Sequence, residues 1–356
     1  MSAPAAGGAR YHLLDHWRGF AALWVLVFHA NRGRPDLTHG WLGGFATHGW
    51  LGVHVFFVIS GYCIAERAAR EYRQHGTARR FTLDRLLRIY PAYWAALIVT
   101  MLLNLAGALV KGQSVLDPAV LPAGPAQWLT AALAIEPWLD QPTYLLVAWT
   151  LTYEVGFYIL AASALGLALR ARRPWIGFAW AGGWLILGLI PATHAWLPLL
   201  ILWPHFALGG VVWLAWQIAP SPATRLASGT LLIGAIYLCS RLQTAAASTW
   251  FGFACGSAWL MLVLRLWDAR LAGAGALRWL GWAGTFSYSI YLVHAPIIGK
   301  IGNLIDRWPV LAGQRVVVLL ASSTLTVGCA WLFYRLVEAR AESFRRSLAA
   351  RPAPPT

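Results

Sequence analysis

The first hydrophobic segment of the chain, HWRGFAALWVLVFHANRGRP (residues 16–35), has an arginine near its start and a histidine near its end. Arg18 and His29 are 11 residues apart, so in an α-helix both side chains share one face, about 16 Å apart along the axis. An arginine inside a membrane costs about 2.5–3.5 kcal/mol, so it usually pairs, snorkels or serves a function. On the plain interpretation Arg18 snorkels or pairs with Asp15, and His29 is a hydrogen-bonded histidine at the membrane interface.

The same spacing fits a flexible ligand whose anionic head binds Arg18 while its reactive group reaches His29. Coenzyme A has this shape, with phosphates at one end and a thioester at the other. The most basic stretch of the chain, residues 67–94, contains seven arginines. These arginines suit the phosphates of coenzyme A and anionic lipid headgroups equally well, so both interpretations stay open. The arginines expected to bind the cofactor are Arg18, Arg79, Arg80, Arg85 and Arg88.

Two later hydrophobic segments also carry polar side chains. Glu154 lies within LLVAWTLTYEVGFY, and His294 lies within TFSYSIYLVHAPI among serine and tyrosine hydroxyls. An acidic residue inside a membrane segment is a functional candidate by default, and the structural alternative is an ion-pair partner for another helix. The hydroxyl groups around His294 either form hydrogen bonds between helices or line a polar cavity.

The second hydrophobic segment, GWLGVHVFFVISGYCIAER, offers weaker candidates. His54 is either a site histidine or a packed one, and the pair Ser60 and Gly61 lets helices approach closely. A role for Ser60 as an acyl nucleophile is disfavoured because the motif GxSxG is absent.

Helices that cross a membrane must position these residues. The chain of 356 residues is 59% hydrophobic and 12% charged, with a mean hydropathy of +0.57. Apolar runs of about 20 residues recur along it, as membrane-spanning helices require. We predict an all-α, polytopic transmembrane helix bundle that forms a single domain over residues 1–356, with its core at 12–338 and a cytoplasmic tail at 339–356. The predicted spans are 12–31, 50–67, 91–110, 144–169, 175–190, 197–217, 227–240, 249–267, 284–301 and 315–335, with a re-entrant or interfacial segment at 125–140.

Basic residues predict the orientation of these spans. With the N-terminus in the cytoplasm, about three quarters of the 28 lysines and arginines fall on the cytoplasmic side, so both termini are expected there. The net charge of +15 is thus attributed to membrane topology and not to nucleic-acid binding. The first segment lacks a small-residue cleavage site, so we expect it to remain as a span. The four cysteines lie in apolar runs without CxxC spacing, so neither a disulfide framework nor a metal site is expected.

Taken together, these motifs resemble the acyltransferase-3 family of integral membrane acyltransferases. The resemblance covers nearly the whole chain and rests on six stretches in order: Arg18-x10-His29, GVHVFFVISG (52–61), RIYPAYW (88–94), WTLTYEVGFY (149–158), SYSIYLVHAPI (287–297) and the pattern Tyr334-x3-Glu338. One departure is Asp84, which stands where the family often has an arginine, and this puts one cofactor contact in doubt. The chain also lacks the C-terminal esterase-like domain of many relatives, so it is expected to be of the stand-alone type.

The resemblance implies transfer of an acyl group, usually acetyl, from cytoplasmic acyl-CoA to a hydroxyl of a cell-surface glycan or lipid-linked sugar, without a metal. His29 is then expected to act as the general base, Arg18 and the basic stretch to hold the donor, and Glu154 to orient a histidine or bind the acceptor. The residues expected to bind substrate are His294, Tyr153, Trp149 and Ser287. The expected location is the cytoplasmic (inner) membrane of a bacterium.

Other functions remain open at the level of sequence. His29 could form an acyl-histidine intermediate instead of acting as a base. The acceptor could be a small molecule such as an antibiotic. A transporter or flippase would also need intramembrane polar residues, but it would not need an arginine cluster one cofactor length from a histidine. A structural scaffold would leave the cost of Arg18, Glu154 and His294 unexplained.

Overall fold

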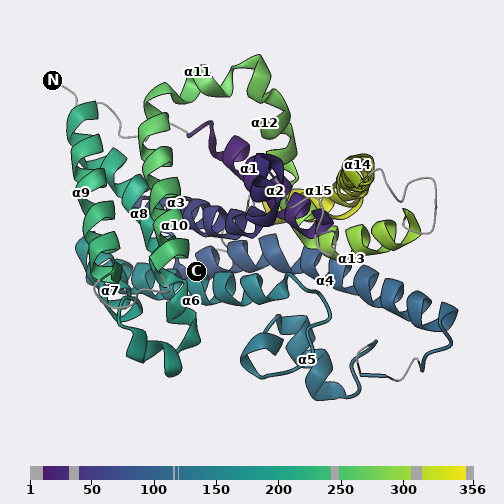
Figure 1. Ribbon diagram of the computed structural model, residues 1–356. Coiled ribbons are helices and arrows are strands. Elements are labelled where there is room, and N and C mark those ends of the chain that lie inside the picture. Colours follow the sequence, from purple (N-terminus) through teal and green to yellow (C-terminus); the bar gives the residue numbers. More distant parts are fainter. Residues whose placement is uncertain are drawn as a thin grey trace. The chain divides into compact units, whose positions relative to one another are not determined.

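The computed structural model of the chain describes residues 11–31, 40–114, 117–118, 120–241, 248–305 and 315–349. Within these ranges all regular structure is helical and there is no strand, which confirms the predicted all-α class (Figure 1). The α-helices are α1 (Leu14–Asn31), α2 (Gly40–Thr47), α3 (Gly52–Arg73), α4 (Ala78–Val110), α5 (Pro125–Leu133), α6 (Ala148–Ala171), α7 (Pro174–Gly188), α8 (Trp203–Ile218), α9 (Pro222–Arg241), α10 (Ser248–Leu264), α11 (Asp268–Ala272), α12 (Arg278–Thr285), α13 (Ser287–Ile305), α14 (Arg315–Phe333) and α15 (Ala339–Ala349). The short turns are η2 (Gly49–Leu51), η3 (Glu136–Trp138), η4 (Pro191–Ala195), η5 (Pro198–Ile201), η6 (Arg265–Trp267), η7 (Gly275–Leu277) and the π-helical turn η9 (Tyr334–Glu338).

Each of the ten predicted spans coincides with a helix of the described chain. Among the described residues, six segments are long and apolar enough to cross a membrane, and they are Gly49–Arg73, Ala78–Val110, Ala148–Ala171, Pro222–Arg241, Trp250–Ala272 and Val316–Leu348. The helices α1, α7, α8 and α13 lie outside this set, so the number of ten spans and the cytoplasmic termini stay predictions. The segment 125–140 holds α5, of nine residues, and η3, both too short to span a membrane.

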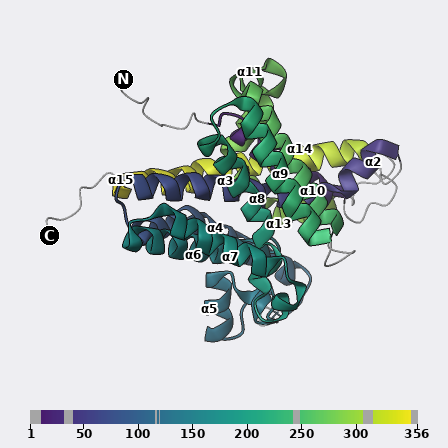
Figure 2. The same ribbon diagram turned by 90° about the vertical axis from the view of Figure 1, so that its left-hand side faces the viewer.

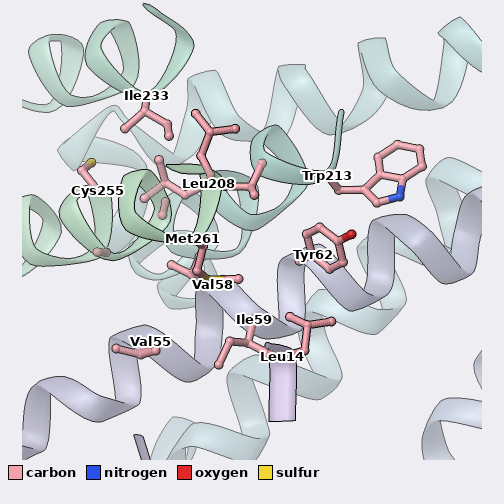
Figure 3. Packing of buried hydrophobic residues seen from close by; sticks show 14 of the residues in the cluster. Leu14, Val55, Val58, Ile59, Tyr62, Leu208, Trp213, Ile233, Cys255 and Met261 are labelled. Carbon is pink, nitrogen blue, oxygen red and sulfur yellow. The ribbon is translucent and has the colours of Figure 1, made fainter. Parts of the chain in front are cut away.

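One compact unit of the chain comprises the described residues of 1–21, 51–78 and 160–285. Its core forms where α3 packs against α8 and where α10 packs against both of these helices. α9 lies beside α10, as Figure 2 shows. Figure 3 shows how Val58 of α3, Leu208 of α8 and Met261 of α10 gather in the completely buried centre of this core.

Two glycines allow α3 and α8 to pack with their backbones close together. A Cβ atom on Gly61 would lie 1.8 Å from the backbone oxygen of Phe206, and one on Gly209 would lie 1.9 Å from that of Val58. Neither position can therefore accept a larger residue without separating the helices. The close helix approach predicted at Gly61 is confirmed.

The second compact unit comprises the described residues of 22–50, 79–159 and 286–356. In this unit α13 packs along α14, and α4 is joined to α5 by three aromatic side chains. Tyr90, Tyr93 and Trp94 donate hydrogen bonds to backbone carbonyls at the C-terminal end of α5. These bonds satisfy carbonyl groups that a helix end leaves without intrahelical partners. The helices α1 and α6 each contribute residues to both units.

The last helical stretch of the described chain changes its winding near the end. α14 passes through the π turn η9 into α15 without a break. Single π turns inside α-helices are rare and occur frequently at functional sites. The turn ends at Glu338, a residue that bonds to the start of α13.

Candidate active site

Arg18 lies in the first turns of α1, where an acid and a thiol hold its guanidinium. It donates hydrogen bonds to Asp15 at 2.9 Å and to the Sγ atom of Cys63, on α3, at 3.1 Å. α1 is pressed against α12 here, because a Cβ atom on Gly19 would lie 2.0 Å from the backbone oxygen of Leu280. The structure thus contains the pair with Asp15 that the plain interpretation predicts. A guanidinium has five N–H donors, so Arg18 keeps donors for a further anion.

His29, in the last turn of α1, lies beside His294 of α13. The centres of the two rings are 4.9 Å apart and the ring planes are tilted by 54°. Phe28 packs edge-on against the His29 ring, with 5.0 Å between ring centres. The sequence placed both histidines in apolar segments and did not predict this contact. We call His29 and His294 the histidine pair.

The second histidine of the pair is completely buried, and α13 is tied to α6 beside it. The ring of Tyr291 lies 5.7 Å from that of His294, and its hydroxyl lies 2.7 Å from the hydroxyl of Thr150, in the first turn of α6. Ser287 is the first residue of α13 and is buried, two helical turns before His294 and on the same face. Ser287, Tyr291 and His294 therefore form one polar stripe along α13.

Glu154 lies one turn beyond Thr150 on the same face of α6. Its carboxylate accepts a hydrogen bond from Tyr158, one further turn along the helix. It is also close enough to Tyr288 and Tyr291 of α13 to act on both hydroxyls electrostatically. Glu154 therefore belongs to the α6 face that meets the polar stripe of α13.

Trp149 and Tyr153 lie on the neighbouring face of α6. Their rings pack edge to face with 6.1 Å between centres, and Trp138 of η3 packs on Tyr153 at the same separation. Trp149 remains 39% exposed. Consecutive helical residues point about 100° apart, which turns these two aromatic rings away from the Glu154 face. The described contacts thus join the two predicted substrate-binding aromatics to η3 and not to the histidine pair.

The predicted cofactor-binding arginines of α4 divide into exposed and buried residues. Arg79 and Arg80, at the start of the helix, are exposed to solvent. Arg85 is buried and donates a hydrogen bond to Asp84 at 2.9 Å. Arg88 is half-buried one turn further along. Two of these four arginines are therefore exposed, whereas the other two are partly or wholly enclosed by the protein.

Asp84 joins two arginines from different helices. Its second oxygen accepts a hydrogen bond from Arg345 of α15, and Arg345 also binds Glu342 at 2.9 Å. We call Asp84, Arg85, Glu342 and Arg345 the Asp84 cluster. The sequence left one cofactor contact in doubt at Asp84, and the structure shows that its carboxylate binds arginine side chains of the protein itself. Arg345 and Glu342 were not predicted, because nothing in the sequence indicates where α15 packs.

Glu338 was not among the predicted site residues either. It accepts hydrogen bonds from the hydroxyl and the backbone N–H of Ser289, in the first turn of α13. Arg88 is close enough to act on Glu338 electrostatically. A carboxylate is favourable at a helix N-terminus, where backbone N–H groups lack intrahelical acceptors. The signal in the sequence was the pattern Tyr334-x3-Glu338, and its structural role is to fix the start of the helix that carries His294.

A second pair of histidines lies in the first unit. The rings of His54 on α3 and His205 on α8 stack with 4.8 Å between centres and 30° between planes. Phe57 and Phe251 pack edge-on against His205. His54 is therefore packed against a second histidine ring in the first unit.

Glu136, in η3, is a buried acid between α5 and α6. Its side chain is 0% exposed, and neither carboxylate oxygen has a hydrogen-bond partner within the described parts of the chain. Burial raises the pKa of this carboxyl to about 7, because removal from water disfavours the charged form. The sequence gave no reason to single out Glu136, since its burial results from the folding of the segment around it.

Comparison with known proteins places the chain in a family. The acyltransferase-3 family, described as an acyltransferase domain, matches residues 11–335. The chain belongs to this family, as its motifs predicted.

Three proteins of Staphylococcus aureus, from strains COL, MSSA476 and MRSA252, are similar to it and are each named "putative O-acetyltransferase". They are 29% identical over 189 residues, which are 50% of this chain and 29% of each relative. The matched part thus spans less than a third of the length of these relatives. No solved structure matches the chain.

Proposed function

We propose that this protein is a membrane O-acyltransferase that moves an acetyl group from acyl-CoA to a hydroxyl of an extracytoplasmic glycan or lipid-linked sugar. The observation that carries the proposal is the histidine pair, in which the completely buried His294 lies against the half-buried His29, in a chain that belongs to an acyltransferase family. The names of the relatives support acetyl as the transferred group.

The reaction needs a base because a sugar hydroxyl attacks a thioester poorly while it keeps its proton. Histidine suits this role, since its unperturbed pKa is about 6.5. In the proposed step the hydroxyl oxygen bonds to the thioester carbon as His29 takes the hydroxyl proton. The carbon–sulfur bond then breaks, and the thiolate of coenzyme A takes the proton from His29. Atoms and charge balance without a metal or redox step.

The donor is held by its phosphates. Arg18 lies 11 residues before His29 on the unbroken helix α1, which gives about 16 Å between the two along the axis. Arg79 and Arg80 are exposed and suit direct contact with phosphates, while Arg85 and Arg88 add positive charge further along α4. The arginines would lie on the cytoplasmic side of a bacterial inner membrane, as the distribution of basic residues predicts.

The acceptor is bound by polar groups near the histidine pair. Glu154 and Ser287 lie on the two helices joined by the bond between Thr150 and Tyr291. A carboxylate and a hydroxyl of this kind can bind sugar hydroxyls. Trp149 and Tyr153 can stack on a sugar ring from the neighbouring face of α6.

The test is a transfer assay with the full-length protein in lipid nanodiscs. Acetyl-CoA is supplied with a panel of lipid-linked saccharides, and both free thiol and acetylated saccharide are measured. We expect thiol release that depends on saccharide and on His29. A wild-type protein that binds no acetyl-CoA at millimolar concentration and releases no thiol would contradict the proposal and favour transport of a substrate.

A further inference from the structure

The buried histidine of the pair has a fixed arrangement of protons. The Nδ1 atom of His294 lies 3.1 Å from the carbonyl oxygen of Ile290 and 2.8 Å from that of Tyr291. Carbonyl oxygens only accept hydrogen bonds, so Nδ1 must carry a hydrogen. In the neutral ring the other nitrogen, Nε2, then holds a lone pair.

This lone pair is sealed inside the protein. His294 is 0% exposed, and its Nε2 atom finds no hydrogen-bond partner among the residues that the structure describes. A buried polar atom without a partner costs free energy, and natural proteins retain few of them. Such an atom in a candidate active site calls for a functional explanation.

The neighbouring ring of the pair supplies one. In a hydrogen bond between two imidazoles the nitrogens are about 3 Å apart and each lies about 1 Å from its ring centre, so the centres are about 5 Å apart. The rings of His29 and His294 have this separation, 4.9 Å, and are tilted by 54°. A rotation of the His29 side chain would point one of its N–H groups at Nε2. Catalytic hydrogen bonds often align in this way only once substrate is bound.

His294 itself is held rigidly. Its Nδ1–H group is shared between two carbonyls of its own helix, and α13 is fixed at its start by Glu338 and beside the ring by the bond between Tyr291 and Thr150. The direction of the Nε2 lone pair is therefore set by the fold. A rigid acceptor is suited to orienting a neighbouring side chain that moves.

We infer that His294 positions His29 for catalysis, with Nε2 of His294 accepting a hydrogen bond from one ring nitrogen of His29. This bond fixes the tautomer of His29, so that its other nitrogen is unprotonated and can take the hydroxyl proton. When His29 gains that proton it becomes positively charged, and its hydrogen bond to Nε2 strengthens as a charge-assisted bond. His294 is thus a positioning residue and does not bind the sugar. This inference rests on the proposed O-acyl transfer.

Two substitutions of His294 test the roles of its two ring nitrogens separately. His294→Asn keeps an N–H donor near the position of Nδ1 but has no atom near Nε2. His294→Gln places an amide oxygen, an acceptor, near the position of Nε2 but loses the Nδ1 donor. A purely structural role, in which the ring only bonds to its own helix, would favour the asparagine variant. The inferred role favours the glutamine variant.

The experiment measures kcat and KM for acyl transfer by both variants in nanodiscs, with acetyl-CoA binding as the test of folding. We expect His294→Asn to lower kcat at least about 100-fold, as loss of a group that aids proton transfer does. His294→Gln should stay within about tenfold of the wild type. The KM for the acceptor should change less than about threefold in both. The acid limb of the kcat profile against pH, where a general base becomes protonated, should remain in the glutamine variant.

Several results would overturn the inference that His294 positions His29 through a hydrogen bond. An asparagine variant that keeps activity equal to that of an active glutamine variant would do so, and so would normal kcat in both or a raised KM alone. If both variants lose activity, each substitution is combined with His29→Gln. Residual rates no lower than in His29→Gln alone support one coupled unit, whereas losses that multiply contradict it. A wild-type protein without transfer activity would instead count against the proposed function itself.

Discussion

Two polar regions of the second unit satisfy their side chains in opposite ways. In the Asp84 cluster both carboxylate oxygens of Asp84 bind arginines, and Arg345 binds a second acid as well. In the histidine pair the Nε2 atom of His294 is buried without a hydrogen-bond partner in the described chain. In the first region the charged groups pair with one another, whereas in the second a ring nitrogen that can accept a hydrogen bond has no partner in the described chain.

This difference separates residues that stabilise from residues that react. Charges that are buried and paired hold α15 against α4, and removal of one partner would leave another charge uncompensated. A residue that orients a neighbouring base must keep its lone pair for that base, so its site tolerates an atom without a partner. We therefore expect substitutions in the Asp84 cluster to lower stability, and substitutions in the histidine pair to lower activity.

The largest effect is expected for His29→Ala. Loss of the general base should reduce acyl transfer by about 10³-fold or more, while the apolar helix α1 still inserts. The measurement is acetylated product per mole of folded protein, with acetyl-CoA binding as the control. Transfer within tenfold of the wild type would show that His29 is not the base. The contrast between a stabilising Asp84 cluster and a reactive histidine pair would then fail.

Next comes Asp84→Asn, which leaves Arg85 and Arg345 facing a neutral amide. We expect the free energy of unfolding to fall by about 3–5 kcal/mol, because the buried Arg85 loses its charged partner and Arg345 keeps only Glu342. Denaturation in mild detergent measures this change. The matched control is Glu66→Gln, which breaks an exposed pair with Arg70 at 3.3 Å and should cost less than about 1 kcal/mol. Equal losses of unfolding free energy in both variants would mean that the Asp84 cluster stabilises the protein no more than an exposed ion pair does.

Replacing the acid Glu136 by its amide should have the opposite effect and raise the free energy of unfolding. Because its folded-state pKa is raised to about 7, the stability from its neutral form is complete below about pH 4.5 and is lost as the pH rises to about 7. Glu136→Gln cannot ionise, so it should match the wild type at pH 4.5 and be more stable by about 2–3 kcal/mol at pH 8. Unfolding curves at both pH values test this. A difference that does not depend on pH would show that the Glu136 carboxyl does not titrate as its burial indicates.

The smallest effect is expected for exposed arginines at the start of α4. Replacing Arg79 and Arg80 together by glutamine should weaken acetyl-CoA binding about tenfold, or about 1.4 kcal/mol. Thermal-shift titration measures it, since saturating ligand stabilises the folded state by mass action. Replacing the exposed Arg172 and Arg173 by glutamine removes the same charge elsewhere and should leave binding nearly unchanged. Equal weakening in both double variants would indicate general electrostatic attraction and not a phosphate site.

Much of the architecture could be read from the sequence because apolar runs of about 20 residues have few other uses. Each predicted span contains a helix, and the short segment 125–140 was correctly set apart from the spans. The helix starting at residue 78 is longer than the predicted span 91–110, because its first part is polar and hydropathy cannot detect it. The motifs also predicted the family, since their order and spacing together are far more specific than any one of them.

The sequence by itself determined that Arg18 and His29 share one helix, because helical rise and rotation depend only on spacing. It also determined that Glu154 and His294 lie in apolar segments. Only the tertiary structure decided which of these side chains meet. His29 and His294 come together because α1 and α13 pack there, and Asp84 meets Arg345 because α15 returns to α4. Contacts between distant segments depend on the packing of whole helices, which a single sequence does not reveal.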